Sequence, residues 1–168
     1  MCTFWRNRGF DFHAVARGPK ETIEFLIESR HKLGINIEER TTDGRTILHL
    51  ACKNREMAIV DLVHNGLEEI NSEIDFNTRD HRQEAPFHTA CANKTSDVAI
   101  QLLQRFPDKI NFLGFYGRHV LHYACRLGQM ELLKYIFGNT DFDIDFNIVD
   151  QSGDTPLHFA CIYGQFEV

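Results

Sequence analysis

The stretch Pro156-Leu157-His158-Phe159-Ala160-Cys161 contains the pattern apolar-His-x-Ala-Cys, which occurs at three earlier places in the chain. Successive copies lie 39, 34 and 36 residues apart, measured between their histidines. Self-similarity at a nearly constant spacing is typical of a solenoid built from stacked repeats. The repeated motif residues are Leu48, His49, Ala51, Cys52; Phe87, His88, Ala90, Cys91; Leu121, His122, Ala124, Cys125; and Leu157, His158, Ala160, Cys161.

The residues in and after each copy predict two short helices. Leu48, Ala51 and Cys52 share one helical face, because they are spaced i, i+3 and i+4. Gly128 and Gly164 mark the end of this helix, where glycine adopts a left-handed conformation at little cost. A second apolar set at helical spacing follows in three units: Ile59, Val60, Val63; Val98, Ala99, Leu102; and Leu132, Leu133, Ile136. Each unit is therefore predicted to contain a turn, a short helix, a tight link, a second helix and a loop.

Residues 153–168, with the pattern Gly-x-Thr-Pro-Leu-His-x-Ala-Cys-x-x-Gly-x-x-Glu-x-Val, resemble the ankyrin repeat at nearly every position. The resemblance covers residues 41–168 well and residues 10–37 loosely. It implies an all-α ankyrin-repeat solenoid of stacked helix-turn-helix units with β-turn or hairpin loops. We predict an N-terminal extension at 1–9 and a single domain at 10–168, with repeats at about 10–40, 41–76, 77–110, 111–146 and an incomplete 147–168.

A single unit cannot bury its own apolar face, so we expect stability to come from neighbouring units. The small Ala and Cys side chains should let adjacent first helices approach closely. In the loops, Phe76 and Phe146 stand where the family has a buried aliphatic residue, and we predict that both rings are buried. The sequence stops where the second helix of the fifth unit would begin, so we expect Leu157 and Ala160 to lack the helix that would cover them. A fragment, a truncated isoform or a subunit that docks by its end would have this feature.

The four His-x-x-Cys pairs raise the question of a metal site, because i and i+3 side chains on a helix can chelate. Each pair belongs to a different unit, however, and packed helices lie about 8–10 Å apart, whereas zinc ligands converge within about 2.0–2.3 Å of one ion. We therefore interpret the histidine as orienting the turn by hydrogen bonding and the cysteine as a small packing residue. The sequence contains no phosphate loop, zinc-protease motif or nucleophile elbow, so we expect no catalytic residue, metal, cofactor or small-molecule substrate.

Charge and composition narrow the class of partner. The chain has 24 acidic and 18 basic residues, a formal net charge of −6, and no cluster of Lys and Arg, which argues against nucleic acid. No stretch approaches the roughly 20 continuous apolar residues of a membrane span. The five cysteines cannot all pair within the chain, and its start lacks the apolar region of a secretory signal. We expect a soluble protein of a reducing compartment, the cytoplasm, with the nucleus as the alternative.

In the ankyrin family, partners bind to the loop tips and to the exposed side of the first helices, which line a concave groove. The resemblance therefore implies a non-catalytic protein-protein interaction module, an adaptor or scaffold for a protein partner. Interface hot spots are enriched in aromatic residues and Arg, which favours the fourth and fifth units. The predicted contact residues are Phe115, Tyr116, Arg118, Tyr123, Arg126, Leu127, Asp154, Phe159, Ile162 and Tyr163.

Two other functions stay open at this point. The chain could be a regulatory ankyrin segment of a larger signalling enzyme or channel, or an inhibitor that resembles the ankyrin-repeat inhibitors of Rel-type transcription factors. The aromatic residues also have a second interpretation, in which some of the rings cover the next repeat and do not contact a partner.

Overall fold

The computed structural model describes residues 12–93 and 95–165, so the predicted N-terminal extension at 1–9 lies outside the described residues. These two ranges contain helices and turns but no strand. None of their helices combines the length and hydrophobicity that crossing a membrane requires. The helices are α1 (Phe12–Arg17), α2 (Lys20–Glu28), α3 (Arg30–Leu33), α4 (Ile47–Lys53), α5 (Met57–Glu68), α6 (Pro86–Cys91), α7 (Asp97–Arg105), η1 (Pro107–Asn111), η2 (Phe115–Gly117), α8 (Val120–Leu127), α9 (Met130–Gly138) and α10 (Pro156–Ile162).

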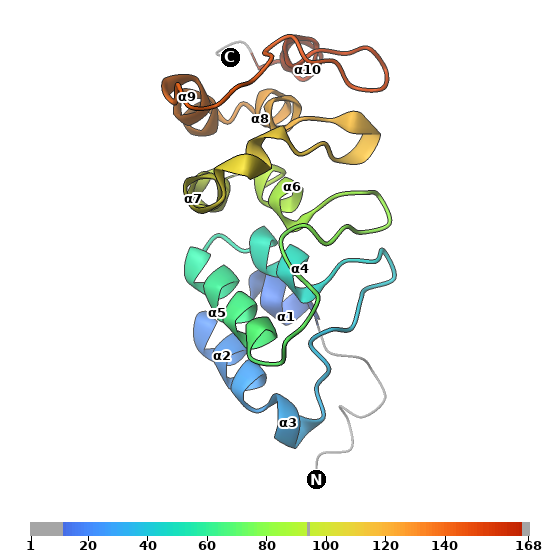
Figure 1. Cartoon of the computed structure of the whole chain (residues 1–168), viewed down its shortest axis with the longest axis vertical. Helices are drawn as coiled ribbons and strands as arrows, with labels where there is room; N and C mark the ends of the chain where they lie inside the picture. Colours follow the sequence, from blue (N-terminus) through green and yellow to red (C-terminus); the bar gives the residue numbers. More distant parts are fainter. Residues whose placement is uncertain (1–11, 94, 166–168) are drawn as a thin grey trace.

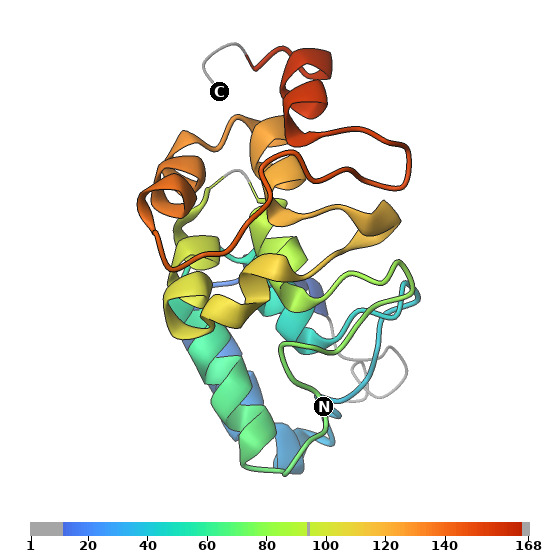
Figure 2. The same cartoon turned by 45° about the horizontal axis from the view of Figure 1, so that its top comes forward.

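The helices form two rows along the long axis of the molecule (Figure 1). The first helices α1, α4, α6, α8 and α10 contact one another in succession, and the second helices α2, α5, α7 and α9 form a parallel row of contacts. The loops that precede α4, α6, α8 and α10 project to the opposite side from the second helices, as both views show (Figures 1 and 2). The predicted all-α solenoid of stacked helical units is therefore confirmed.

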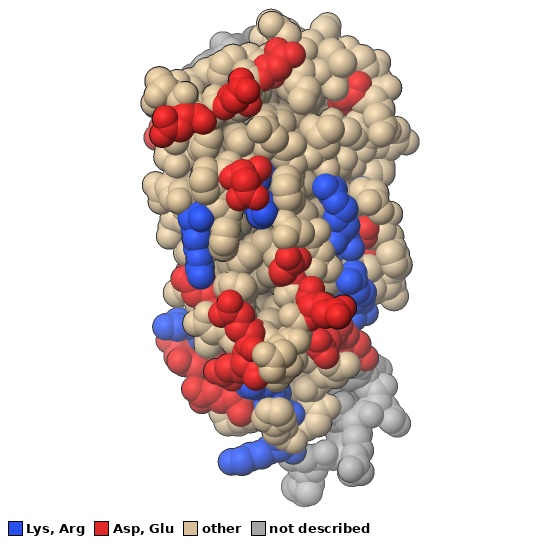
Figure 3. Space-filling model, viewed as in Figure 1, with Lys and Arg blue, Asp and Glu red and all other residues tan. Residues whose placement is uncertain are grey.

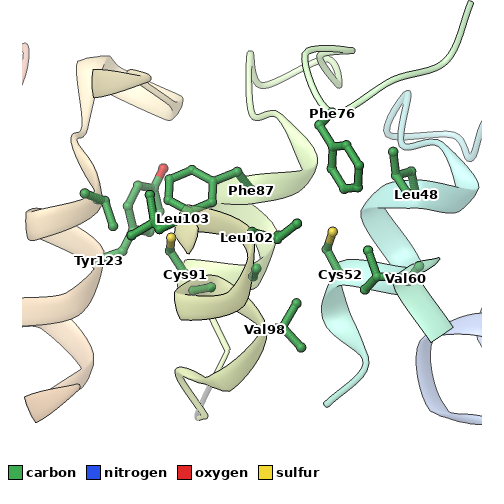
Figure 4. Packing of buried hydrophobic residues seen from close by; sticks show 14 of the residues in the cluster. Leu48, Cys52, Val60, Phe76, Phe87, Cys91, Val98, Leu102, Leu103 and Tyr123 are labelled. Carbon is green, nitrogen blue, oxygen red and sulfur yellow. The ribbon is translucent and has the colours of Figure 1, made fainter. Parts of the chain in front are cut away.

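The repeated Ala, and the Cys of the first three copies, lie inside the stack, whereas the prediction is wrong for Cys161, which is exposed because no further unit covers it in the described residues. Ala51, Ala90, Cys52 and Cys91 are all 0% exposed, so adjacent first helices pack without a gap at these positions. Figure 4 shows Cys52 in the space between its own unit and the side chains that the third unit contributes. Because a buried position of this size admits no larger side chain without strain, small residues at these positions are what allow the helices to stack.

Leu157 and Ala160, on the last helix, differ in burial. Leu157 is 64% exposed, as expected for a residue without cover. The same expectation is wrong for Ala160, which is 2% exposed, because α10 packs against α8 and buries this side of the helix.

The two loop phenylalanines also differ. Phe76 is 4% exposed and lies 5.0 Å from the His64 ring and 5.1 Å from the Phe106 ring, measured between centroids. The prediction of burial is wrong for Phe146, which is 46% exposed and stacks at 4.8 Å on Phe137. A ring from the following unit covers Phe76, whereas the ring contact of Phe146 is with Phe137 of its own unit.

Candidate functional site

Four loops of the same shape project from the stack. Each is closed by a hydrogen bond of 2.9 Å from the first residue's N–H to the carbonyl four residues later, and the residue before that carbonyl has a positive φ. The bonds join Thr41 to Arg45, Asp80 to Glu84, Gly114 to Arg118 and Asp150 to Asp154. Glycine supplies the positive φ at Gly44, Gly117 and Gly153, but Gln83 adopts a φ of 65° in the third unit. Only glycine is free of strain in this conformation.

Buried aspartates hold two of these loops. The Oδ1 atom of Asp150 accepts hydrogen bonds from the backbone N–H of Ser152 at 2.8 Å and of Asp154 at 3.1 Å, and its side chain is 0% exposed. Arg118 in the preceding loop donates from Nε to Oδ2 of Asp150 at 3.4 Å. Burial acts to raise the pKa of Asp150, but the hydrogen bonds from the two backbone N–H groups and from Arg118 outweigh it and lower the pKa. Asp80 and Arg45 repeat this arrangement one loop earlier.

The motif histidines of the second, third and fourth units connect their helices to the segment that leads into or forms the next loop. In the second unit, Nδ1 of His49 accepts the Thr46 backbone N–H at 3.1 Å, which leaves the proton on Nε2, and Nε2 donates to the Glu84 carbonyl at 2.9 Å. His122 bonds in the same way to the His119 N–H and to the Asp154 carbonyl. The predicted role of the histidine in orienting the turn is confirmed, and the same ring also fixes the position of the following loop.

Burial keeps these histidines neutral. The rings of His49, His88 and His122 are 0% exposed, and burial is the main cause that lowers the pKa of each, to about 4 in His88. His119 occupies the position of Thr46 and Thr155 at the start of its helix, and burial together with the nearby His122 lowers its pKa to about 4.

Three of the four motif cysteines, Cys52, Cys91 and Cys125, are poor nucleophiles in this environment. Burial raises the pKa of the Cys52 and Cys91 thiols well above the usual range and raises that of Cys125 to about 11. The thiol form therefore predominates at neutral pH, and the thiolate is the nucleophile and metal ligand. In residues 12–93 and 95–165, no group of three His, Cys, Asp or Glu side chains is placed to hold a metal ion.

We call one surface of the molecule the loop face. It consists of the loop tips at 42–45, 81–84, 115–118 and 151–154 and of the predicted contact residues at the ends of the first helices, Arg126, Leu127, Ile162 and Tyr163. Among the predicted contact residues on it, Tyr116, Ile162 and Tyr163 are 50%, 66% and 51% exposed. The half-buried members are Phe115, Arg118, Arg126, Leu127 and Asp154.

Two predicted contact residues are buried instead. Tyr123 and Phe159 were expected to be exposed on the loop face, and each is only 4% exposed. The Tyr123 hydroxyl donates to Oε1 of Glu84 at 2.9 Å, and its ring lies 5.9 Å from that of His88. Phe159 packs edge-on against His122 at 5.3 Å. Both rings therefore cover the histidine of the preceding unit. The second interpretation is thus right that these rings pack within the stack, but wrong about the repeat that they cover, which is the preceding one and not the next.

Three arginines of the loop face lie over aromatic rings. The guanidinium of Arg82 is 5.4 Å from the centroid of Phe115, that of Arg118 is 4.9 Å from Phe159, and that of Arg126 is 5.5 Å from Tyr163. Each arginine belongs to one unit and its ring to the next. Arg82 was not among the predicted contact residues, although it stands at a loop tip one unit before an aromatic tip residue, Phe115. That pairing across one repeat length is the signal that could have identified it.

Comparison with known proteins agrees with this architecture. A family model described as ankyrin repeats (3 copies) matches residues 65–147 and 87–168, and a model of the single ankyrin repeat matches residues 43–74. Together the matches cover most of the chain.

Several curated relatives are similar over most of this chain. Rabankyrin-5 of Mus musculus is 26% identical over 147 residues, which are 88% of this chain but only 12% of that protein. The putative ankyrin repeat protein FPV223 of Fowlpox virus is 27% identical over 83% of this chain and 89% of its own length. NF-kappa-B inhibitor alpha of Sus scrofa is 28% identical over 76% of this chain and 40% of its own length.

Proposed function

Because the chain belongs to the ankyrin-repeat family, we propose that it is a non-catalytic adaptor or scaffold that binds a protein partner through the loop face. Ankyrin repeats are protein-interaction modules, and the matching family models indicate no catalytic family. The observation that carries the proposal is the exposure of Tyr116, Ile162 and Tyr163 on one face of the fourth and fifth units. Large apolar and aromatic side chains grouped on a surface mark interaction sites.

The rigidity of the loops supports this use of the face. The backbone of the 150–154 loop is held by the Asp150 carboxylate, by the His122 ring and by a hydrogen bond from the Gln151 N–H to the Tyr116 carbonyl at 2.9 Å. A surface ordered before binding loses little conformational entropy when a partner binds. The exposed side chains of this face are therefore presented on a fixed frame.

Two narrower roles each have one supporting observation. The similarity to NF-kappa-B inhibitor alpha supports an inhibitor of a transcription factor. The match to 12% of Rabankyrin-5, a much longer protein, supports an ankyrin segment of a larger protein. Both roles use the loop face in the same way, so the test of the surface comes first.

The test compares substitutions on and off the loop face. Partners captured from lysate by the wild-type chain are identified by mass spectrometry, purified, and titrated by calorimetry against Tyr116→Ala and Tyr163→Ala. We expect each substitution to weaken binding by about tenfold, as for a hot-spot residue. Phe137→Ala is the matched control, because Phe137 is 60% exposed on α9, in the row of second helices. Binding that is lost with Phe137→Ala and kept with the two tyrosine variants would overturn the proposal.

A further inference from the structure

We propose that the partner segment bound by the loop face is acidic, and that its carboxylates bind Arg82, Arg118 and Arg126. This inference rests on the proposed function and specifies the chemistry of the partner. It starts from the three arginines, each of which lies over a ring contributed by the next unit.

A contact between a guanidinium and an aromatic ring does not use up the N–H groups of the arginine. A guanidinium over an aromatic face is held through its plane, while the N–H groups at its rim stay available to a planar acceptor. A carboxylate fits this rim with two parallel hydrogen bonds. Arg82 is exposed and Arg126 is half-buried, so their rims are open to a bound chain.

The charges of these arginines are largely unused within the described residues. In residues 12–93 and 95–165, Arg82 and Arg126 form no ion pair. Arg118 pairs with the buried Asp150 through Nε alone, at 3.4 Å. The Glu84 carboxylate accepts the Tyr123 hydroxyl through Oε1 and forms no ion pair with Arg82 among the described residues. In the 150–154 loop, next to that of Arg118, Asp150 is buried and Asp154 is half-buried. Removal of the negative charge of Asp154 should therefore favour an acidic ligand.

Basic side chains lie on the loop side of a chain that is acidic as a whole. The chain as a whole has a net charge of −6. Figure 3 shows basic side chains on the loop side of the middle of the stack, with acidic side chains beside and below them, and further acidic side chains that follow one another over the segment after α9. Complementary charge across an interface guides association and selects the partner. An acidic peptide can match three separate arginines, whereas the continuous phosphate charge of a nucleic acid is repelled by the surrounding acidic surface.

The test uses a phage-displayed library of random 12-residue peptides selected on the immobilised chain. We expect the selected peptides to be enriched in Asp and Glu relative to the unselected library. Synthetic copies are then titrated by fluorescence anisotropy against Arg82→Gln/Arg126→Gln, which keeps Arg118 with its Asp150 partner. The double variant should bind about tenfold or more weakly, since two charge-assisted contacts are lost, and Asp154→Asn should bind more tightly than the wild type.

A matched control and the possible outcomes separate this inference from the proposed function. Lys20→Gln/Lys134→Gln removes the same charge from exposed residues of the second helices and should bind within twofold of the wild type; circular dichroism shows whether each variant folds. Selected peptides without acidic enrichment, or equal binding by the Arg82→Gln/Arg126→Gln variant, overturn the acidic partner alone. Selected peptides that are insensitive to Tyr116→Ala/Tyr163→Ala, or a library that yields no binder, overturn the proposed function as well. Displacement of the peptides by a single-stranded oligonucleotide favours nucleic acid and overturns the inference.

Discussion

Lowering the pH from 7 to 5 is expected to destabilise the fold through two buried histidines. His88 and His119 are 0% and 1% exposed, and burial lowers the pKa of each to about 4. In the unfolded chain the pKa of a histidine is about 6.5. Because the folded pKa is the lower of the two, the unfolded chain binds more protons between pH 6.5 and pH 4. The contribution of each histidine to stability is therefore complete above about pH 6.5 and is lost as the pH falls toward 4.

The two pKa values set the size of the effect. For one histidine, the free energy of unfolding falls by about 2 kcal/mol between pH 7 and pH 5, and for both by about 4 kcal/mol. That is a large share of the total stability of a domain, which is about 5–15 kcal/mol. Burial lowers the pKa of His49 and His122 as well, so these two rings act in the same direction.

Urea unfolding followed by circular dichroism at the two pH values measures the effect, and His119→Thr isolates one histidine. Threonine fits this position, because in the second and fifth units Oγ1 of Thr46 and Thr155 lies 2.9 Å from Nδ1 of the motif histidine. The variant should lose about 2 kcal/mol less stability than the wild type between pH 7 and pH 5. His31→Gln, at an exposed histidine, should leave the difference unchanged. Equal pH dependence in the wild type and in His119→Thr would refute the reasoning.

Three further predictions test other parts of the structure. Gln83→Gly should stabilise the chain by about 1 kcal/mol, measured by urea unfolding, since it relieves a positive φ; a lower stability would contradict this. Cys91→Leu should cost about 1–3 kcal/mol through overpacking of a fully buried site, whereas Cys161→Leu, at an exposed cysteine, should change the stability little. Asp150→Ala should cost about 2 kcal/mol at pH 7, because two backbone N–H groups lose their acceptor. The pKa of Asp150 is lowered in the folded chain, so its stabilisation is present above about pH 4 and declines at lower pH; a cost that stays constant down to pH 2 would argue against the carboxylate as the source.

The fold could be predicted from the sequence because the relevant signals are local. The motif around His158, its recurrence and the apolar residues at helical spacing lie within single units, and each specifies a helix and its buried side. The burial of a particular ring was harder to predict, because it depends on a neighbour about one repeat away. Phe76 and Phe146 stand in nearly identical sequences, yet within residues 12–93 and 95–165 only Phe76 is covered by a ring of the following unit, that of Phe106. The arginine–ring pairs escaped prediction for the same reason, since each joins two units.

The burial of Tyr123 and Phe159 also changes which substitutions can test binding. Both rings cover a motif histidine. The Tyr123 hydroxyl donates to the side chain of Glu84, and the backbone carbonyl of the same Glu84 accepts a hydrogen bond from His49. Tyr123→Ala should therefore disturb the position of two loops and lower stability as well as binding, so a weaker complex would not distinguish a contact from a support. Tyr116 is half exposed, and Tyr116→Ala removes surface that a partner can reach while the buried connections stay intact. A loss of affinity without a loss of stability at Tyr116 is thus the result that identifies the loop face as the interface.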